Sequence, residues 1–176
     1  MERSRAFTLP ELLFAVAIGM GLVGWGVPAL RDIQRDSART REVNQFLRAI
    51  HLARSEAMKR NDVVSLCPSG DGLSCGSPPI AWQDGWMVFV NFDRDQPAQR
   101  DPGEPMLKVY PRWKQGTIVG NRPTLSFRAF GQLAVTATFT FCDDRGPSSA
   151  RAVIISQTGR PRLADRSSSG SPLPCK

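Results

Sequence analysis

The residues of this chain with the clearest chemical potential are two arginines near its C-terminal end, Arg160 and Arg162. Pro161 separates them and Gly159 precedes them. Gly159 can adopt a positive φ and turn the chain out of a preceding strand. In an extended segment Arg160 and Arg162 project to the same side, and Pro161 stiffens the segment between them. Because guanidinium groups donate paired hydrogen bonds to phosphate oxygens, this pattern predicts contact with a phosphate backbone and not with base edges.

A purely structural role for the same two arginines is the alternative. Asp143 and Asp144 lie earlier in the sequence. Either arginine could pair with these carboxylates in a clasp, or remain solvated. The sequence leaves both interpretations open.

The charge of the chain is concentrated in its C-terminal part. Residues 1–104 contain 12 basic and 13 acidic side chains, whereas residues 105–176 contain 11 basic and only three acidic ones. Arginine makes up 19 of the 23 basic residues, so the alternative explanation is a genome that favours arginine and a surface that is merely soluble. Such a bias would not remove acids from one part of the chain only. A basic part of this kind is typical of surfaces that bind polyanions.

The residues needed for catalysis or metal binding are scarce. His51 is the single histidine, and the four cysteines form no C-x-x-C motif. This composition argues against a zinc site and against a His-dependent catalytic triad. We expect no enzyme activity, no metal and no cofactor.

An apolar segment near the N-terminus predicts a membrane span. Residues 12–30 carry no charge, and as a helix they would extend roughly 28 Å, close to the thickness of a bilayer core. Glu11 stands at the start of this run, and Arg3 and Arg5 precede it. By the positive-inside rule the N-terminus is cytoplasmic and the rest of the chain lies outside. An ordinary single-span anchor is the alternative, but it leaves Glu11 and the short basic leader unexplained.

The segment Ala6-Phe7-Thr8-Leu9-Pro10-Glu11-Leu12-Leu13 resembles the class III signal of type IV pilins and pseudopilins. The resemblance implies that a prepilin peptidase cleaves between Ala6 and Phe7 and methylates the new amino group. It also implies that Glu11 pairs with the N-terminal amine of a neighbouring subunit. Ala6 departs from the family, which usually has glycine there. The expected organisation is a leader over residues 1–6, a membrane and filament-core helix over residues 7–30, and a periplasmic domain over residues 31–176.

The cysteines indicate an oxidising compartment. Four cysteines allow three pairings. Cys67 and Cys75 enclose a short loop rich in proline and glycine, so a local bridge is easy, and Cys142 would then pair with Cys175. The second bridge would tether a Ser-, Pro- and Gly-rich tail over residues 167–176 and contribute about 3 to 4 kcal/mol. The alternative is that one or both pairs remain thiols.

The remaining pattern predicts an α+β, pilin-like fold. Apolar residues at helical spacing between Val43 and Ala57 extend the first helix to about residue 59, with Arg39 and Arg48 off the apolar stripe. His51 and the tryptophans Trp82, Trp86 and Trp113 are assigned packing roles. We expect this long helix to pack on antiparallel strands at residues 63–67, 85–92, 106–110, 116–119, 125–130, 135–142 and 152–157.

The segments from Phe141 to Gly146 and from Ala150 to Leu163 resemble the FimT/GspH family of minor pilins and pseudopilins, most closely FimT-type minor pilins. In such pilins a Gly-Arg-x-Arg pattern is associated with DNA binding in natural transformation (competence). The resemblance thus implies a minor pilin, anchored in the inner membrane and incorporated into a pilus, that binds DNA through Gly159, Arg160, Arg162 and Arg166. The alternative is a structural subunit of a pilus or of a type II secretion system with no DNA role.

Overall fold

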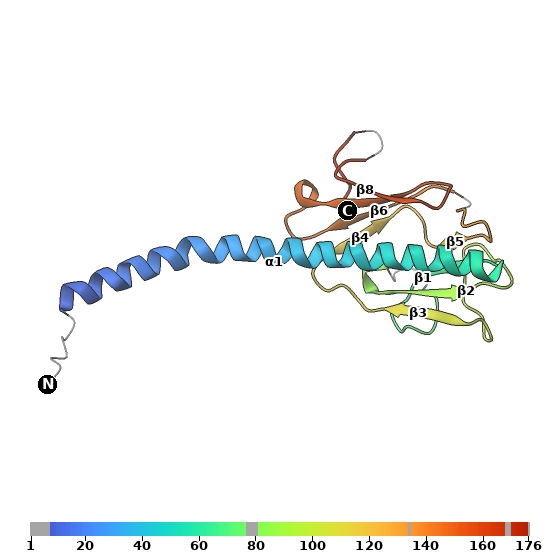
Figure 1. Ribbon diagram of the computed structural model, residues 1–176, viewed down its shortest axis with the longest axis horizontal. Helices are drawn as coiled ribbons and strands as arrows, with labels where there is room; N and C mark the ends of the chain where they lie inside the picture. The colour runs from blue at the N-terminus through green and yellow to red at the C-terminus, as the bar shows by residue number, and fades with distance from the viewer. Residues whose placement is uncertain (1–7, 77–80, 134, 168–169, 176) are drawn as a thin grey trace. The chain divides into compact units, whose positions relative to one another are not determined.

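The computed structural model describes residues 8–76, 81–133, 135–167 and 170–175, and it divides the chain into two compact units, residues 1–37 and 38–176. The helix α1 (Leu9–Arg60) contributes to both units (Figure 1). Its observed bounds agree with the long helix that the sequence predicts, since it begins and ends close to the expected residues.

In the first unit the described side chains of α1 are exposed apart from the half-buried Arg35, and many of them are large and apolar, including Leu12, Phe14, Ile18 and Leu22. Glu11 lies in the first turn of the helix. The side chains of residues 23 and 25–29 lie outside the described part of the chain, as do Ala6 and Phe7. Over the part that is described, no helix meets the length and apolarity required to cross a membrane. The membrane span and the cleavage site therefore stay predictions.

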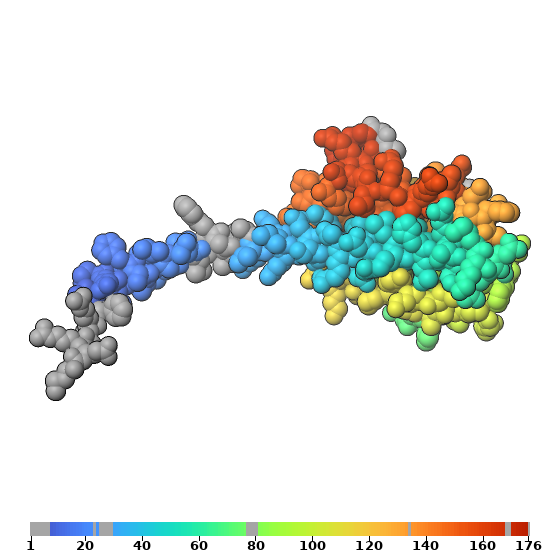
Figure 2. Space-filling model, in the orientation of Figure 1, coloured from blue at the N-terminus to red at the C-terminus, as the bar shows by residue number. Residues whose placement is uncertain are grey.

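In the second unit one face of α1 is buried. Val43, Phe46, Ile50, Ala53 and Ala57 follow helical spacing and are almost completely inaccessible, as the apolar stripe predicts. Figure 2 shows this part of the helix between segments of the two sheets described next.

Over the residues that the structure describes, the strands form two antiparallel sheets of four strands each. The first has the order β3-β2-β1-β5 and the second the order β4-β6-β7-β8 (Figure 1). The bounds in the first sheet are β1 (Val64–Pro68), β2 (Trp86–Val90), β3 (Met106–Tyr110) and β5 (Leu125–Phe127). Those in the second are β4 (Thr117–Gly120), β6 (Ala137–Cys142), β7 (Arg151–Ile155) and β8 (Pro161–Ala164), and two short 3-10 helices, η1 (Trp82–Asp84) and η2 (Pro147–Ser149), lie in the connections.

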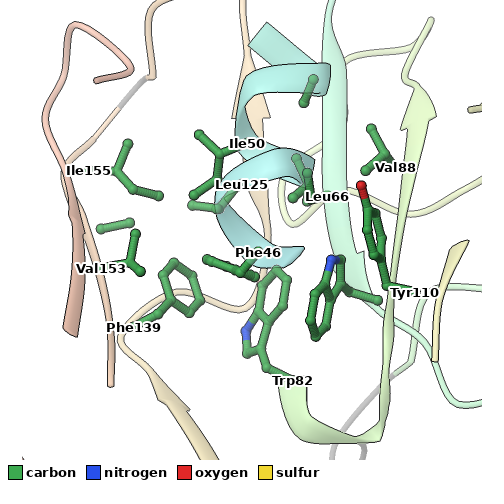
Figure 3. Close-up of a cluster of buried hydrophobic side chains, with 14 of the residues drawn as sticks. Phe46, Ile50, Leu66, Trp82, Val88, Tyr110, Leu125, Phe139, Val153 and Ile155 are labelled. Carbon is green, nitrogen blue, oxygen red and sulfur yellow. The ribbon is translucent and has the colours of Figure 1, made fainter. Parts of the chain in front are cut away.

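Phe46 lies at the centre of the core between the helix and the sheets (Figure 3). Its ring centroid is 5.6 Å from Trp82, 5.4 Å from Trp86 and 4.8 Å from Phe139. These side chains come from a helix, a connection and strands of both sheets, so one aromatic cluster joins the elements of the second unit. All residues of the core cluster fall between positions 43 and 155 of the sequence, within the second unit. The second unit thus has a hydrophobic core of its own. The predicted packing roles of the three tryptophans are confirmed, since Trp113 is buried in the same core.

Both expected disulfides are present, Cys67–Cys75 and Cys142–Cys175. The second bridge brings the C-terminal tail to the end of β6. Leu173 in the tail is buried against Cys142, Ala150 and Ala152, on the side of the second sheet that faces away from the main core. The tail is therefore packed by a side chain as well as tethered by its cysteine.

Three details differ from the sequence-based expectation. His51 was assigned a packing role, but its side chain is exposed on α1. The segment Pro161–Ala164 forms the strand β8, which was not predicted because proline and charged residues rarely occur in central strands. Proline is tolerated as the first residue of an edge strand, and this is the position of Pro161. Arg39 was expected off the apolar stripe but is buried, because the second sheet supplies a carboxylate for it.

Candidate nucleic-acid interface

The turn between β7 and β8 fixes where the arginine motif begins. Gly159 has a φ of 71°, a conformation that favours glycine, and its N–H donates to the Ser156 carbonyl at 2.9 Å. The Ser156 N–H donates to the Arg160 carbonyl at 3.2 Å, which closes the hairpin. A Cβ at position 159 would also overlap the carbonyl oxygen of Gly131. Glycine is thus required at this position both by its φ and by the close approach of a second loop.

The register of β8 determines the direction of the arginine side chains. Leu163 pairs with Val153, whose side chain lies in the main core, so Leu163 is on the core side of the sheet. Arg162 pairs with Ile154 and is on the opposite face. The alternation of extended backbone places Arg160 on the face of Arg162. Both arginines are exposed, which is the environment that phosphate binding requires.

Asp143, one of the two acids that the structural alternative invoked, is occupied by other partners. The Arg39 guanidinium donates to its carboxylate at 3.1 Å, and the Arg145 guanidinium does so at 2.7 Å. Burial opposes ionisation of Asp143, but the hydrogen bonds and charge of Arg145, with the charge of Arg39, outweigh it and lower its pKa. Within the described ranges no carboxylate forms an ion pair with Arg160 or Arg162. The proposed clasp between these arginines and Asp143 or Asp144 is therefore not formed.

A further acid of this region, Asp165, is also paired. Asp165 forms an ion pair with Arg151, which lies at the start of β7. Arg166 is exposed, and its guanidinium donates to the Gly170 carbonyl at 3.3 Å. At the edge formed by β8, the face of the second sheet that points away from the main core therefore carries Arg160 and Arg162. Arg166 follows the strand, and the packed tail lies beside these arginines.

A second basic segment lies next to the β7–β8 turn and was not identified from the sequence. The loop from Arg128 to Gln132 contacts Gly159 through Gly131, and the Leu133 N–H donates to the Gln157 carbonyl at 2.9 Å. The Arg54 side chain of α1 donates to the Gly131 carbonyl at 3.1 Å. The signal that could have indicated this loop is the absence of acids between residues 105 and 142, which leaves Arg128 with no acidic neighbour in sequence.

The chemistry available to this surface is the binding of anions. In the described segments, no group of three or more His, Cys, Asp and Glu side chains could hold a metal ion. Of the other predicted functional residues, Glu11 is exposed on the first unit, and Ala6 and Phe7 lie outside the described residues. The structure brings Gly159, Arg160 and Arg162 together, and Glu11 belongs to the other unit.

A long N-terminal helix packed on antiparallel sheets defines a pilin-like fold. The sequence model of the family described as Type II transport protein GspH matches residues 42–159, and the chain belongs to this family. Two crystal structures of the type IV minor pilin FimU of Pseudomonas aeruginosa are similar. One is 25% identical, covers 80% of this chain and 98% of its own and gives a TM-score of 0.54. The other is 23% identical, covers 83% and 98%, and gives a TM-score of 0.57.

No curated protein sequence matches the chain. The minor-pilin and pseudopilin family is thus established by the family match together with the fold. Members of this family assemble with other pilin-like subunits. Other pilin subunits are therefore the partners of this protein, and it is incorporated into a pilus or pseudopilus.

Proposed function

We propose that this protein is a minor type IV pilin that binds DNA non-specifically through its C-terminal basic surface, for DNA uptake in natural transformation. The observation that carries the proposal is the position of Arg160 and Arg162. Arg162 is exposed in the edge strand β8 and Arg160 is exposed immediately before it, and Asp143 and Asp165 in the same half of the molecule are paired with other arginines.

The charge of the region supports a polyanionic ligand. Two neighbouring guanidinium groups held by a short strand can each donate paired hydrogen bonds to a phosphate. Contacts of this kind carry no sequence information, so the expected binding is weak and insensitive to sequence.

The N-terminal segment supports incorporation into a filament at the inner membrane. In this proposal the prepilin peptidase cleaves between Ala6 and Phe7, the apolar part of α1 anchors the chain in a single pass, and Glu11 neutralises the new N-terminal amine of a neighbouring subunit. The domain with the arginines then lies in the periplasm, which agrees with its two disulfides.

The second candidate function is a structural pseudopilin of a type II secretion system. The observation that favours it is the family description, Type II transport protein GspH. In this case the basic surface would contact protein, and DNA would not bind.

The two functions are distinguished by DNA retardation with the full-length protein in a non-ionic detergent at low salt. We expect the wild-type protein to retard DNA at micromolar concentration and the double variant Arg160→Gln/Arg162→Gln to lose most of this binding. The control is Arg41→Gln/Arg48→Gln, which removes two exposed charges from α1. Equal losses in both variants would indicate only a dependence on total charge. No retardation by the wild-type protein would favour the structural subunit.

A further inference from the structure

Phe130 is an exposed aromatic side chain in the loop beside the arginine motif. It is 82% exposed, and the aromatic side chains of Phe46, Trp82, Trp86 and Tyr110 are buried, as are the other described aromatics of the second unit except Phe92. The backbone around Phe130 is fastened on both sides. The Gly131 N–H donates to the Arg128 carbonyl at 2.7 Å, and the Arg128 N–H donates to the Gln132 carbonyl at 2.9 Å. An exposed ring on a fixed backbone loses little conformational freedom when a ligand stacks on it.

A cavity of about 510 Å³ lies beside this ring. Its lining includes the aromatic Phe130, the amide side chains of Asn61 and Gln132, and the charged side chains of Asp62, Arg94 and Arg128. The volume is within the range of small-molecule sites and exceeds that of one nucleobase. The amides can donate and accept hydrogen bonds at the edge of a base, and the ring offers a stacking face.

The charge at this cavity favours an anionic ligand. Among the described residues that line it, Asp62 is the one acid, and the Arg94 guanidinium pairs with it at 3.5 Å. Arg128 is exposed and has no carboxylate partner within the described segments. A phosphate approaching Phe130 therefore meets an available cation.

The cavity and the arginine motif belong to two loops that touch. The Gly131 carbonyl lies against Gly159, Phe130 precedes Gly131, and Arg160 follows Gly159. The Arg54 side chain holds this junction from the helix side through its hydrogen bond to Gly131. A chain of nucleotides could thus contact Arg160 and Phe130 at the same time.

We propose that this surface binds single-stranded DNA, with an unpaired base stacked on Phe130 and the adjacent phosphates held by Arg128 and Arg160. The inference rests on the proposed function and specifies its substrate. In a duplex the bases are stacked on one another, and only a single strand offers a free base face. Duplex DNA can use the arginines alone, so it binds without a contribution from Phe130.

The test compares a thymine oligonucleotide with a duplex containing the same number of phosphates, each titrated by fluorescence anisotropy against the full-length protein in detergent. Phe130→Ala should weaken binding of the single strand by at least about fivefold and change duplex binding by less than about twofold. The matched control is Phe92→Ala, which removes an exposed ring, 55% accessible, that does not line the cavity. Phe130→Trp should retain binding of the single strand. The fluorescence of the tryptophan introduced at position 130 should be quenched by the oligonucleotide but not by the duplex.

The outcomes separate this inference from the proposed function. If Phe130→Ala binds both DNA forms as the wild-type protein does, or loses both equally, stacking on Phe130 is refuted, and retention of the arginine dependence still supports DNA binding. If Phe130→Ala instead abolishes only incorporation into a filament, the ring contacts a neighbouring pilin subunit and the inference is wrong. If the wild-type protein binds neither DNA form, the proposed function fails as well.

Discussion

The Arg39 guanidinium in α1 lies 3.1 Å from the carboxylate of Asp143, which follows the last residue of β6. Both side chains are almost completely buried, with exposed fractions of 6% and 3%. This ion pair joins the helix to the second sheet beside the Cys142–Cys175 bridge. A buried carboxylate of this kind is costly to leave without cations, so the pair acts on stability.

Removing Asp143 should destabilise the second unit more than removing Arg39. Asp143→Ala removes the carboxylate that the buried Arg39 guanidinium shares with the half-buried Arg145 guanidinium, and it should lower the free energy of unfolding by about 3 kcal/mol. Arg39→Met leaves Asp143 paired with Arg145 and should cost less, about 1 to 2 kcal/mol. Both changes in the free energy of unfolding can be measured by urea denaturation of a chain that begins at Arg31, with tryptophan fluorescence as the signal. Equal losses would show that Arg145 does not compensate.

The stability of the protein should depend on Glu42 at neutral pH. Burial raises the pKa of Glu42 from 4.5 to about 6, and the charge of Arg41 offsets this only in part. The folded state thus binds the Glu42 proton more tightly than the unfolded state does. The free energy of unfolding therefore falls as the pH rises from 4.5 to about 6, and this loss of stability persists at higher pH. Glu42→Gln should raise the free energy of unfolding at pH 7 by about 1 to 2 kcal/mol and have little effect at pH 4.

Glu56 provides a control of opposite sign for this pH experiment. Its hydrogen bond with Arg60 lowers its pKa, so ionised Glu56 stabilises the folded state above the unfolded pKa and this contribution is lost at lower pH. Glu56→Gln should therefore destabilise at pH 7 and not at low pH. A stabilising effect of both substitutions at pH 7 would contradict the assignment.

The salt dependence of DNA binding should report the number of phosphates contacted. With three or four phosphates at Arg160, Arg162, Arg166 and their neighbours, the logarithm of the binding constant should fall with the logarithm of salt concentration at a slope of about −2 to −4. Arg160→Gln/Arg162→Gln should reduce this slope by about 2, with an unchanged circular dichroism spectrum. An unchanged slope in the double variant would place the phosphate contacts elsewhere.

Loss of the second disulfide should release the tail before it affects the sheet. Cys142→Ala/Cys175→Ala removes a cross-link between residues 33 apart and should lower the free energy of unfolding by about 3 kcal/mol. Residues 170–175 should show faster hydrogen exchange once the tail is released. DNA binding through Arg162 and Arg166 should also weaken, because Leu173 would no longer pack near Ile154 and Ala164 beside these arginines. Loss of protection throughout β6 and β7 would show instead that the tail is required for the fold.

Processing of the N-terminus should produce Phe7 as the first residue. Mass spectrometry of the protein isolated from membranes should detect N-methylated Phe7, and an intact Met1 terminus would contradict the predicted cleavage. Glu11→Ala should be cleaved normally but incorporated poorly into filaments, because it removes the charge partner of the neighbouring amine and not the cleavage site.

Local sequence patterns determined most of the elements of this protein. The apolar stripe from Val43 to Ala57 needed only helical spacing to predict the buried face of α1, and seven strands followed from runs of β-branched and aromatic residues between glycines and prolines. Cys67 and Cys75 are close in sequence, so their pairing required no tertiary information, and Cys142–Cys175 followed from it.

Tertiary structure alone decided the partners of the arginines. Arg39 and Asp143 are 104 residues apart, so no local pattern could show that the helix carries a buried cation to meet that carboxylate. The strand β8 is stable because β7 offers it a hydrogen-bonding edge, although its own proline disfavours a strand. The loops that carry Phe130 and Arg160, far apart in sequence, meet because Gly159 lacks a Cβ, which would overlap the carbonyl oxygen of Gly131.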